Sequence, residues 1–136
     1  ERAPVRVFYQ VWSQPLMTLS DRHVVGEVIR LCGGRNVFGS LLPLVPRVSV
    51  EAVIAADPEI IVTAEADAQP SAAFELWRRY PKLRAVAADL LVTLDANRIN
   101  RHGPRLLDEA QVLCERVDDA RKSRAAAGVA SPPTKP

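Results

Sequence analysis

The sequence lacks any long hydrophobic run and any strong excess of one charge. No apolar stretch in its 136 residues approaches the roughly 20 that a membrane-spanning helix needs, so we expect no membrane span in this chain. The formal net charge is only +2, which does not favour nucleic acid or acidic lipid as a partner. Hydrophobic residues make up 48%, enough for one domain with a substantial core.

Catalytic motifs are also missing. The sequence shows no nucleophile elbow, no glycine-rich phosphate loop and no pair of carboxylates at motif spacing. The two histidines are His23, expected at the surface in a helical first turn, and His102, which lies beside Arg101 and is a minor candidate for contacting a ligand or haem iron. We therefore expect a protein that is not an enzyme and holds no metal or cofactor of its own.

The ordered domain is expected to span residues 1–121. The following stretch, KSRAAAGVASPPTKP, has few large apolar side chains and cannot bury enough surface to offset its ordering entropy. Residues 122–136 are accordingly predicted to form a disordered tail. No signal peptide is visible, so either the chain is cytosolic or the sequence starts inside a larger precursor.

Strands and helices alternate along the domain. Strands are predicted at 5–11, 59–63 and 90–94 from their β-branched and apolar composition. Helices are predicted from a cap at Ser20 or Asp21 to Leu31, from a cap at Ser49 through VEAVIAA, from a cap at Ser71 to about residue 79, and from Pro104 onward. We treat SQPLMTL and NVFGSLLPLVPR as irregular connections, since proline interrupts both.

The order β-α-α-β-α-β-α predicts an α/β domain, a three-layer lobe with a mostly parallel central sheet flanked by helices. In such sheets ligands usually lie beyond the carboxyl ends of the strands. The loops after Val11, Thr63 and Leu94 are therefore the predicted ligand loops. Tyr9 and Val11 should face one side of the first strand, and Gln10 and Trp12 the other.

Only two cysteines are present, Cys32 and Cys114, each on an apolar helix face. They can be two buried thiols or a crosslink, and the residues alone do not decide between these alternatives. A metal site is not expected, because no third or fourth ligand is near in the sequence. If bonded, the pair closes a loop of about 80 residues, stabilises the fold by roughly 4 kcal/mol and requires an oxidising compartment.

Four sequence blocks occur in an order typical of one protein family. They are VFYQVWSQPLMT, IRLCGGRNVFG, VPRVSVEAVIAADPEIIV and LDANRINRHGPRLLDEAQVLCERV. Together they resemble the C-terminal lobe of the periplasmic substrate-binding proteins that serve iron-siderophore, haem and vitamin B12 ABC importers. The resemblance covers about residues 5 to 120.

This resemblance implies that the chain is one of two α/β lobes joined by a long helix, with the ligand in the cleft between them. Residues 1–3 would be the exit from that helix. The implied ligand is cobalamin, the implied partner is an inner-membrane ABC permease, and the implied location is the periplasm. In the cobalamin-binding members a disulfide joins the positions of Cys32 and Cys114, so the resemblance favours a crosslink here.

The resemblance also implies roles for individual residues. Glu51 would pair with arginines of the permease, although a carboxylate in a first helical turn also stabilises the helix dipole by about 0.3–1 kcal/mol. Arg101 would face the ligand, where a guanidinium can hydrogen-bond amides or phosphate. Trp12, Gln10 and Asp95 are the other expected ligand contacts, since they lie at the ends of the first and last strands.

One position departs from the cobalamin-binding members. They carry a tryptophan directly before the proline that leads into VS-x-E, where this sequence has Val45. The departure leaves haem or a ferric siderophore as alternative ligands. The alternative function, of a class other than a binding protein, is a small cytosolic α/β enzyme or regulatory domain with free thiols.

Overall fold

The computed structural model describes residues 4–13, 16–41, 43–65, 70–95 and 104–130. Its strands are β1 (Val5–Gln10), β2 (Trp12–Ser13), β3 (Leu16–Met17), β4 (Gly34–Asn36), β5 (Ile60–Glu65) and β6 (Leu91–Asp95). Its helices are α1 (Val24–Leu31), α2 (Val50–Ala56), α3 (Pro70–Arg78), α4 (Arg84–Ala87) and α6 (Pro104–Ala130). The predicted alternation of strands and helices is confirmed.

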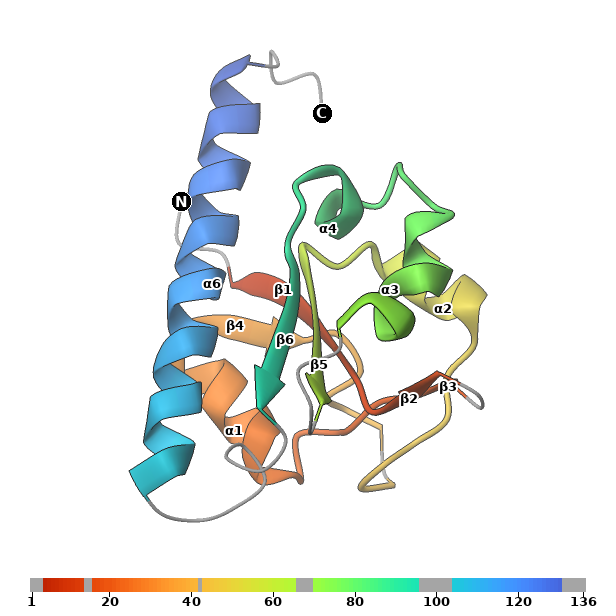
Figure 1. The fold of residues 1–136 in the computed structure, drawn as a ribbon, viewed down its shortest axis with the longest axis vertical. Coiled ribbons are helices and arrows are strands. Elements are labelled where there is room, and N and C mark those ends of the chain that lie inside the picture. The colour runs from red at the N-terminus through yellow and green to blue at the C-terminus, as the bar shows by residue number, and fades with distance from the viewer. Residues whose placement is uncertain (1–3, 14–15, 42, 66–69, 96–103, 131–136) are drawn as a thin grey trace.

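A four-stranded parallel sheet forms the centre of the domain, with strand order β4-β1-β5-β6 (Figure 1). Val7 of β1 pairs with Ile60 of β5, and Ile61 of β5 pairs with Leu91 of β6. The carboxyl ends of β1, β5 and β6 therefore lie at one end of the sheet, which we call the carboxyl end. The opposite end, where these strands begin, is the amino end.

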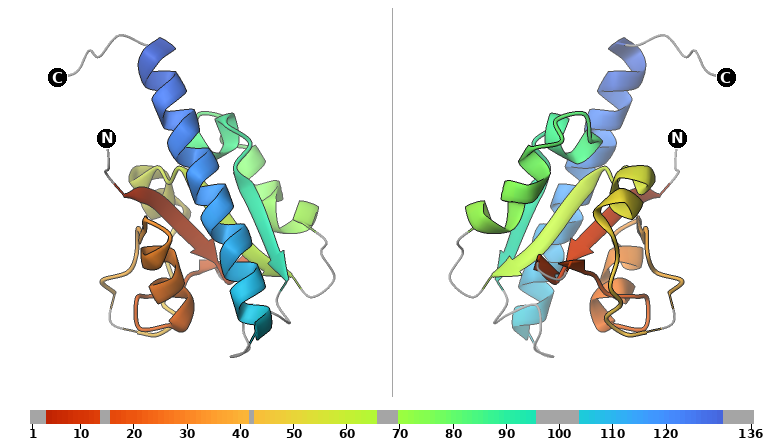
Figure 2. Two further views of the ribbon diagram at one scale, coloured as in Figure 1. Left: turned by 90° about the vertical axis from the view of Figure 1, so that its left-hand side faces the viewer. Right: turned by 90° about the vertical axis from the view of Figure 1, so that its right-hand side faces the viewer.

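Helices cover both faces of the sheet, as the three-layer prediction requires. Helices α1 and α6 lie on one face, and α2, α3 and α4 on the other (Figures 1 and 2). Val7 and Tyr9 of β1 join the core beneath α1 and α6, whereas Phe8 joins the core beneath α3, where it packs edge-on against Trp77. Burial on both faces explains why successive positions are apolar, as in Ile60–Val62 of β5.

Helix α1 begins later than predicted. Its cap is His23, whose Nδ1 accepts a hydrogen bond from the Val25 backbone N–H at 3.1 Å. The expected caps were wrong, because the Ser20 hydroxyl instead accepts from the Arg22 N–H in a preceding turn. His23 is half-buried rather than a plain surface residue. The helix ends at Leu31, as predicted, and Gly33 just beyond it has a φ of +86°.

Four short elements escaped the sequence prediction. Strand β4 pairs with the start of β1, although it contains no β-branched residue; Gly34 packs so closely on Val7 and Ile29 that a Cβ there would lie 3.1 Å from each. Strands β2 and β3 form an antiparallel ribbon within the stretch that we expected to be irregular. Helix α4 is a single turn before β6.

The other helices follow the prediction closely. Ser49 caps α2 by accepting from the Ala52 N–H at 3.0 Å. Helix α3 includes Ser71 instead of starting after it, so the predicted cap there was wrong. Helix α6 begins at Pro104 and continues to Ala130, past the boundary expected at residue 121. The alanines at 125–127 favour this extension, because alanine has the highest helix propensity.

A disulfide between Cys32 and Cys114 joins the end of α1 to α6. Its sulfur atoms are 1.97 Å apart and the Cα atoms 4.8 Å apart. Arg121 of α6 adds a second link, since its Nη2 donates to the Gly33 carbonyl oxygen at 3.1 Å. The crosslink that the resemblance favoured is therefore present, and the two helices of one layer are covalently connected.

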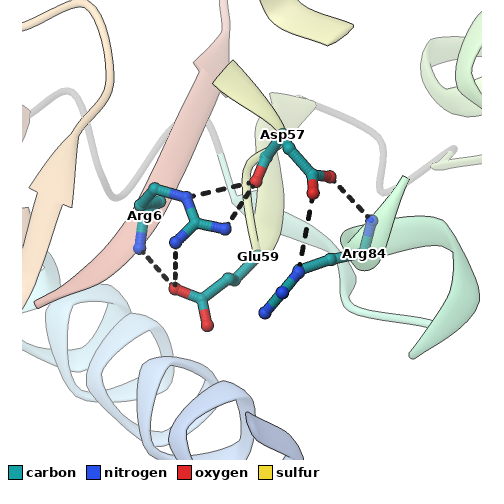
Figure 3. A network of polar contacts seen from close by, with 4 residues as sticks. All are labelled: Arg6, Asp57, Glu59 and Arg84. Atoms are coloured by element: carbon teal, nitrogen blue, oxygen red, sulfur yellow. Dashed lines mark hydrogen bonds and ion pairs between the residues drawn. The ribbon is translucent and has the colours of Figure 1, made fainter. Parts of the chain in front are cut away.

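A charged network stabilises the amino end of the sheet (Figure 3). The guanidinium of Arg6 donates twice to the carbonyl oxygen of Asp57, at 2.9 and 3.2 Å, and lies 3.6 Å from Glu59 Oε1. Glu59, only 4% exposed, also accepts from the Arg6 backbone N–H at 3.0 Å. The Asp57 carboxylate accepts from the Arg84 N–H at 3.0 Å, at the start of α4. The network thus fixes β1, the end of α2 and α4 around the start of β5.

Glu59→Ala is expected to lower the free energy of unfolding by about 3 kcal/mol, because the Arg6 backbone N–H loses its acceptor and the Arg6 guanidinium loses its carboxylate partner. Glu51→Ala, the same change at an exposed carboxylate, should cost no more than about 1 kcal/mol. Urea unfolding of both variants measures the difference. Equal losses would contradict a structural role for the network.

Reducing the disulfide is expected to lower the free energy of unfolding by about 4–5 kcal/mol, given the separation of 82 residues in the sequence. Urea unfolding with and without dithiothreitol tests this, and the double variant Cys32→Ser/Cys114→Ser should unfold identically in both conditions. A thiol count on unfolded, unreduced protein should find none. Two free thiols would show that the crosslink does not form.

Candidate functional site

The carboxyl end of the sheet is the candidate site, because the ends of β1, β5 and β6 meet there. Gln10 ends β1, Thr63 lies near the end of β5, and Thr93 lies opposite Thr63 on β6. The ribbon β2–β3 continues directly from β1 at this end (Figure 1). The predicted ligand loops after strands β1, β5 and β6 therefore leave the sheet at neighbouring points.

Gln10 is buried beneath the site, with only 2% of its surface exposed. Its side-chain oxygen accepts a hydrogen bond from the indole N–H of Trp77 in α3 at 2.5 Å. Its backbone carbonyl accepts from the Thr63 hydroxyl at 3.0 Å. Gln10 and Tyr9 face opposite sides of the sheet, as alternation predicted. Gln10 thus connects α3 to the carboxyl ends of β1 and β5.

A layer of neutral polar groups lies around Gln10. Thr63 and Thr93 are register partners on adjacent strands. Among the described residues, the Thr93 hydroxyl oxygen is the one buried side-chain atom with no hydrogen-bond partner. A buried hydroxyl without a partner is unusual in a folded protein. This layer offers hydrogen-bonding capacity close to the strand ends.

The chain that follows β1 is fixed to the sheet by backbone carbonyls. The hydroxyl of buried Thr18 donates to the Tyr9 carbonyl oxygen at 2.6 Å. The Val11 N–H donates to the Met17 carbonyl oxygen at 2.8 Å. Burial also raises the pKa of the Tyr9 phenol, so this side chain remains neutral at physiological pH. These two hydrogen bonds hold the chain after β1 close to the carboxyl end of that strand.

The connection from β4 to α2 adds apolar surface that the sequence analysis did not select. The Leu44 carbonyl accepts from the Ser20 N–H, and the Pro46 carbonyl from the Thr18 N–H, each at 3.0 Å. The connection therefore lies along the segment that follows β3. Leu44 is 50% exposed and Leu41 37% exposed, whereas Val45 is half-buried. In the sequence, leucines next to prolines in this connection were the signal that could have pointed to an apolar surface.

The remaining predicted ligand contacts are placed only in part. Trp12 lies in β2, where it pairs with Met17, and Asp95 is the last residue of β6. The structure thus brings the backbone of both residues to the carboxyl end. Arg101 and His102 lie outside the described residues. The ligand roles of Gln10, Trp12, Asp95 and Arg101 stay predictions.

Glu51 is exposed in the first turn of α2. The Ser49 cap fixes where this helix starts, so the carboxylate projects from a defined position. Helix α2 begins on the side of the carboxyl end, because it follows β4 and returns to the start of β5. Docking through Glu51 stays a prediction.

Within the described part of the chain, no three His, Cys, Asp or Glu side chains gather closely enough to hold a metal ion. No helix in that part combines the length and apolar character needed to cross a bilayer. Trp77 and Tyr80 pack against the core beneath α3, and Trp77 is fully buried.

No protein-family model matches the chain. Individual proteins do. The chain is 37% identical over 120 residues to a vitamin B12-binding protein of Vibrio cholerae, covering 88% of this chain and 42% of the relative. It is 35% identical over 116 residues to a vitamin B12-binding protein of Photorhabdus laumondii, covering 85% and 40%. The chain thus spans less than half the length of these curated relatives.

Solved structures agree with the sequence matches. The periplasmic vitamin B12-binding protein of Vibrio cholerae aligns with a TM-score of 0.76 and 33% identity, over 90% of this chain and 47% of that one. A periplasmic haem-binding protein solved with two haems aligns with a TM-score of 0.70 and 25% identity, over 86% and 45%. The α/β sandwich of helices and parallel sheet is the architecture shared in these alignments.

A double-mutant cycle tests the Gln10–Trp77 hydrogen bond. Gln10→Leu and Trp77→Phe should each lower the free energy of unfolding by about 2–3 kcal/mol, because each leaves a buried polar partner behind. The double variant should cost at least about 1 kcal/mol less than the sum, because both partners are then apolar. Urea unfolding of the three variants gives the coupling. Strict additivity would show that the two side chains do not interact.

Proposed function

The chain matches a part of the periplasmic substrate-binding proteins of the vitamin B12 and haem class, and we propose its function from this match. The chain forms one α/β lobe of a protein that captures cobalamin between two lobes and delivers it to an inner-membrane ABC permease. The observation that carries this proposal is the 37% identity over 120 residues to the vitamin B12-binding protein of Vibrio cholerae.

The carboxyl end of the sheet is the proposed ligand-facing surface of this lobe. The ribbon β2–β3, the exposed side chains of Leu41 and Leu44, and the ends of β5 and β6 contribute to it. An apolar surface with a few polar groups suits a large macrocycle, since ligand sites are mostly apolar and polar groups fix orientation. Trp12, Asp95 and Arg101 are the proposed direct contacts, and Gln10 supports them from below through Trp77.

The proposed cellular setting follows from the same class. The periplasm is an oxidising compartment, in which the Cys32–Cys114 disulfide forms and persists. Glu51 is the proposed docking residue, because a carboxylate and an arginine pair with defined geometry. The role is binding and delivery, and it requires no catalytic step and no resident cofactor.

Haem is the second candidate ligand. Two observations favour it: the structural likeness to a haem-binding protein solved with two haems, and Val45 at the position where cobalamin-binding members carry tryptophan. Both ligands are large, flat macrocycles, so the same apolar surface suits either. The two proposals differ in the ligand but share the lobe, the cleft and the partner.

Cyanocobalamin is expected to bind this chain alone more weakly than about 1 µM, because one lobe offers only half of a two-lobed cleft and a ligand site normally buries most of its ligand. Amide NMR shifts should nevertheless concentrate at the carboxyl end, on residues 10–13, 41–45 and 63–65. Arg101→Ala should reduce these shifts, whereas Arg22→Ala, at an exposed site in the turn before α1, should not.

Submicromolar affinity of the isolated chain, or shifts spread over the amino end, would contradict the proposed half-cleft. Titration with haem in parallel separates the two ligands, because a tighter haem complex with a shifted Soret band would favour the alternative. Glu51→Ala should leave the amide shifts caused by the ligand unchanged, and should weaken only the binding of the permease in a pull-down assay.

A further inference from the structure

A groove lies away from the candidate site, at the amino end of the sheet. It has a volume of about 480 Å³ and is lined by seven residues of α2, the end of α3 and the connection to α4: Ile54, Asp57, Arg79, Tyr80, Pro81, Lys82 and Leu83. Helices α2, α3 and α4 gather on one face of the sheet (Figure 1). The volume lies within the range of about 300–1,000 Å³ typical of small-molecule sites.

The groove has an apolar floor. Ile54 is 36% exposed, although the other large apolar side chains of its helix, Val50 and Val53, pack against the core. Tyr80 is half-buried, and its ring lies 6.3 Å from that of Trp77, so it is held in a fixed orientation. Leu83 is buried against the core beneath them. The apolar part of a ligand can therefore bury its surface on this floor, whose side chains are already held in place.

Unpaired cations border this floor. Arg79 and Lys82 are exposed, and within the described part of the chain the structure gives neither of them an ion pair or hydrogen bond through its side chain. The carboxylate of Asp57 is the acidic group of the lining, and Arg84 compensates it through a 3.5 Å ion pair and a 3.0 Å hydrogen bond. The charge at the groove is therefore positive overall.

We propose that this groove binds a small amphipathic anion, a molecule with an apolar body and one phosphate or carboxylate group. The apolar body packs on Ile54, Tyr80 and Leu83, and the acidic group pairs with Arg79 and Lys82. Arginine suits this role because its planar group binds phosphate and carboxylate bidentately. The groove lies at the opposite end of the sheet from the proposed cobalamin surface, so the two sites are independent.

Octyl phosphate, used below its micelle concentration, is a probe of this chemistry. Amide NMR titration of the disulfide-bonded chain should give saturable shifts on Ile54, Tyr80 and Leu83. Inorganic phosphate, the same anion without the apolar body, should bind at least about tenfold more weakly, a difference of about 1.4 kcal/mol. Octyltrimethylammonium, a similar apolar body with the opposite charge, should not saturate the groove.

Arg79→Gln/Lys82→Gln is the decisive variant, expected to weaken octyl phosphate at least tenfold. The matched control is Arg35→Gln/Lys122→Gln, which removes the same charge from two exposed positions in β4 and α6 and should leave the affinity unchanged. Thermal unfolding of both variants reports whether the fold is intact.

Four outcomes would overturn the proposal. Equal weakening in both double variants would show a general charge effect, and equal binding of inorganic phosphate would show an anion site without an apolar part. If Arg79→Gln/Lys82→Gln lowers the thermal stability but leaves the affinity for octyl phosphate unchanged, these cations only stabilise the C-terminus of α3 through the helix dipole. Binding only to vesicles containing phosphatidylglycerol, and not to octyl phosphate, would indicate a membrane surface as the occupant.

Discussion

Burial of both faces of one parallel sheet is the constraint on which this structure depends. Residues 5–10 of β1 and 60–63 of β5 are buried or half-buried, so each face needs its own helical layer. Once both faces are covered, the two ends of the sheet and its edge strands β4 and β6 remain. Ligands of parallel sheets usually bind beyond the carboxyl ends of the strands, and the two polar clusters described above lie at the two ends.

The two ends use different chemistry. Charged groups cluster at the amino end, where Arg6, Glu59, Asp57 and Arg84 hold four segments together (Figure 3). Neutral groups occupy the carboxyl end, where Gln10 bonds to Trp77 and Thr63 bonds to the Gln10 carbonyl. Neutral groups that bond to one another keep their partners when a ligand leaves. Gln10, Thr63 and Trp77 therefore hold one another in place at the carboxyl end without an added molecule, which would suit the proposed ligand-facing surface.

The sequence predicted the elements whose signal is local. Apolar runs located β1, β5 and β6, and Ser49 and Pro104 marked helix starts. Strand β4 was missed because its pairing depends on the close packing of Gly34, and His23 was missed because imidazole is an uncommon cap. At the site, alternation placed Gln10 on the correct face. It did not predict that a tryptophan 67 residues away would occupy its side-chain oxygen.

The Cys32–Cys114 bond also divides the chain mechanically. It encloses β4, β5 and β6 in one covalent ring, whereas β1 and the second half of α6 lie outside it. Force applied at the two ends passes through the sulfur bridge and not through the enclosed strands. Stretching the molecule would therefore pull β1 out from between β4 and β5 and unwind the end of α6. The residues inside the ring would not add to the extension as long as the disulfide is intact.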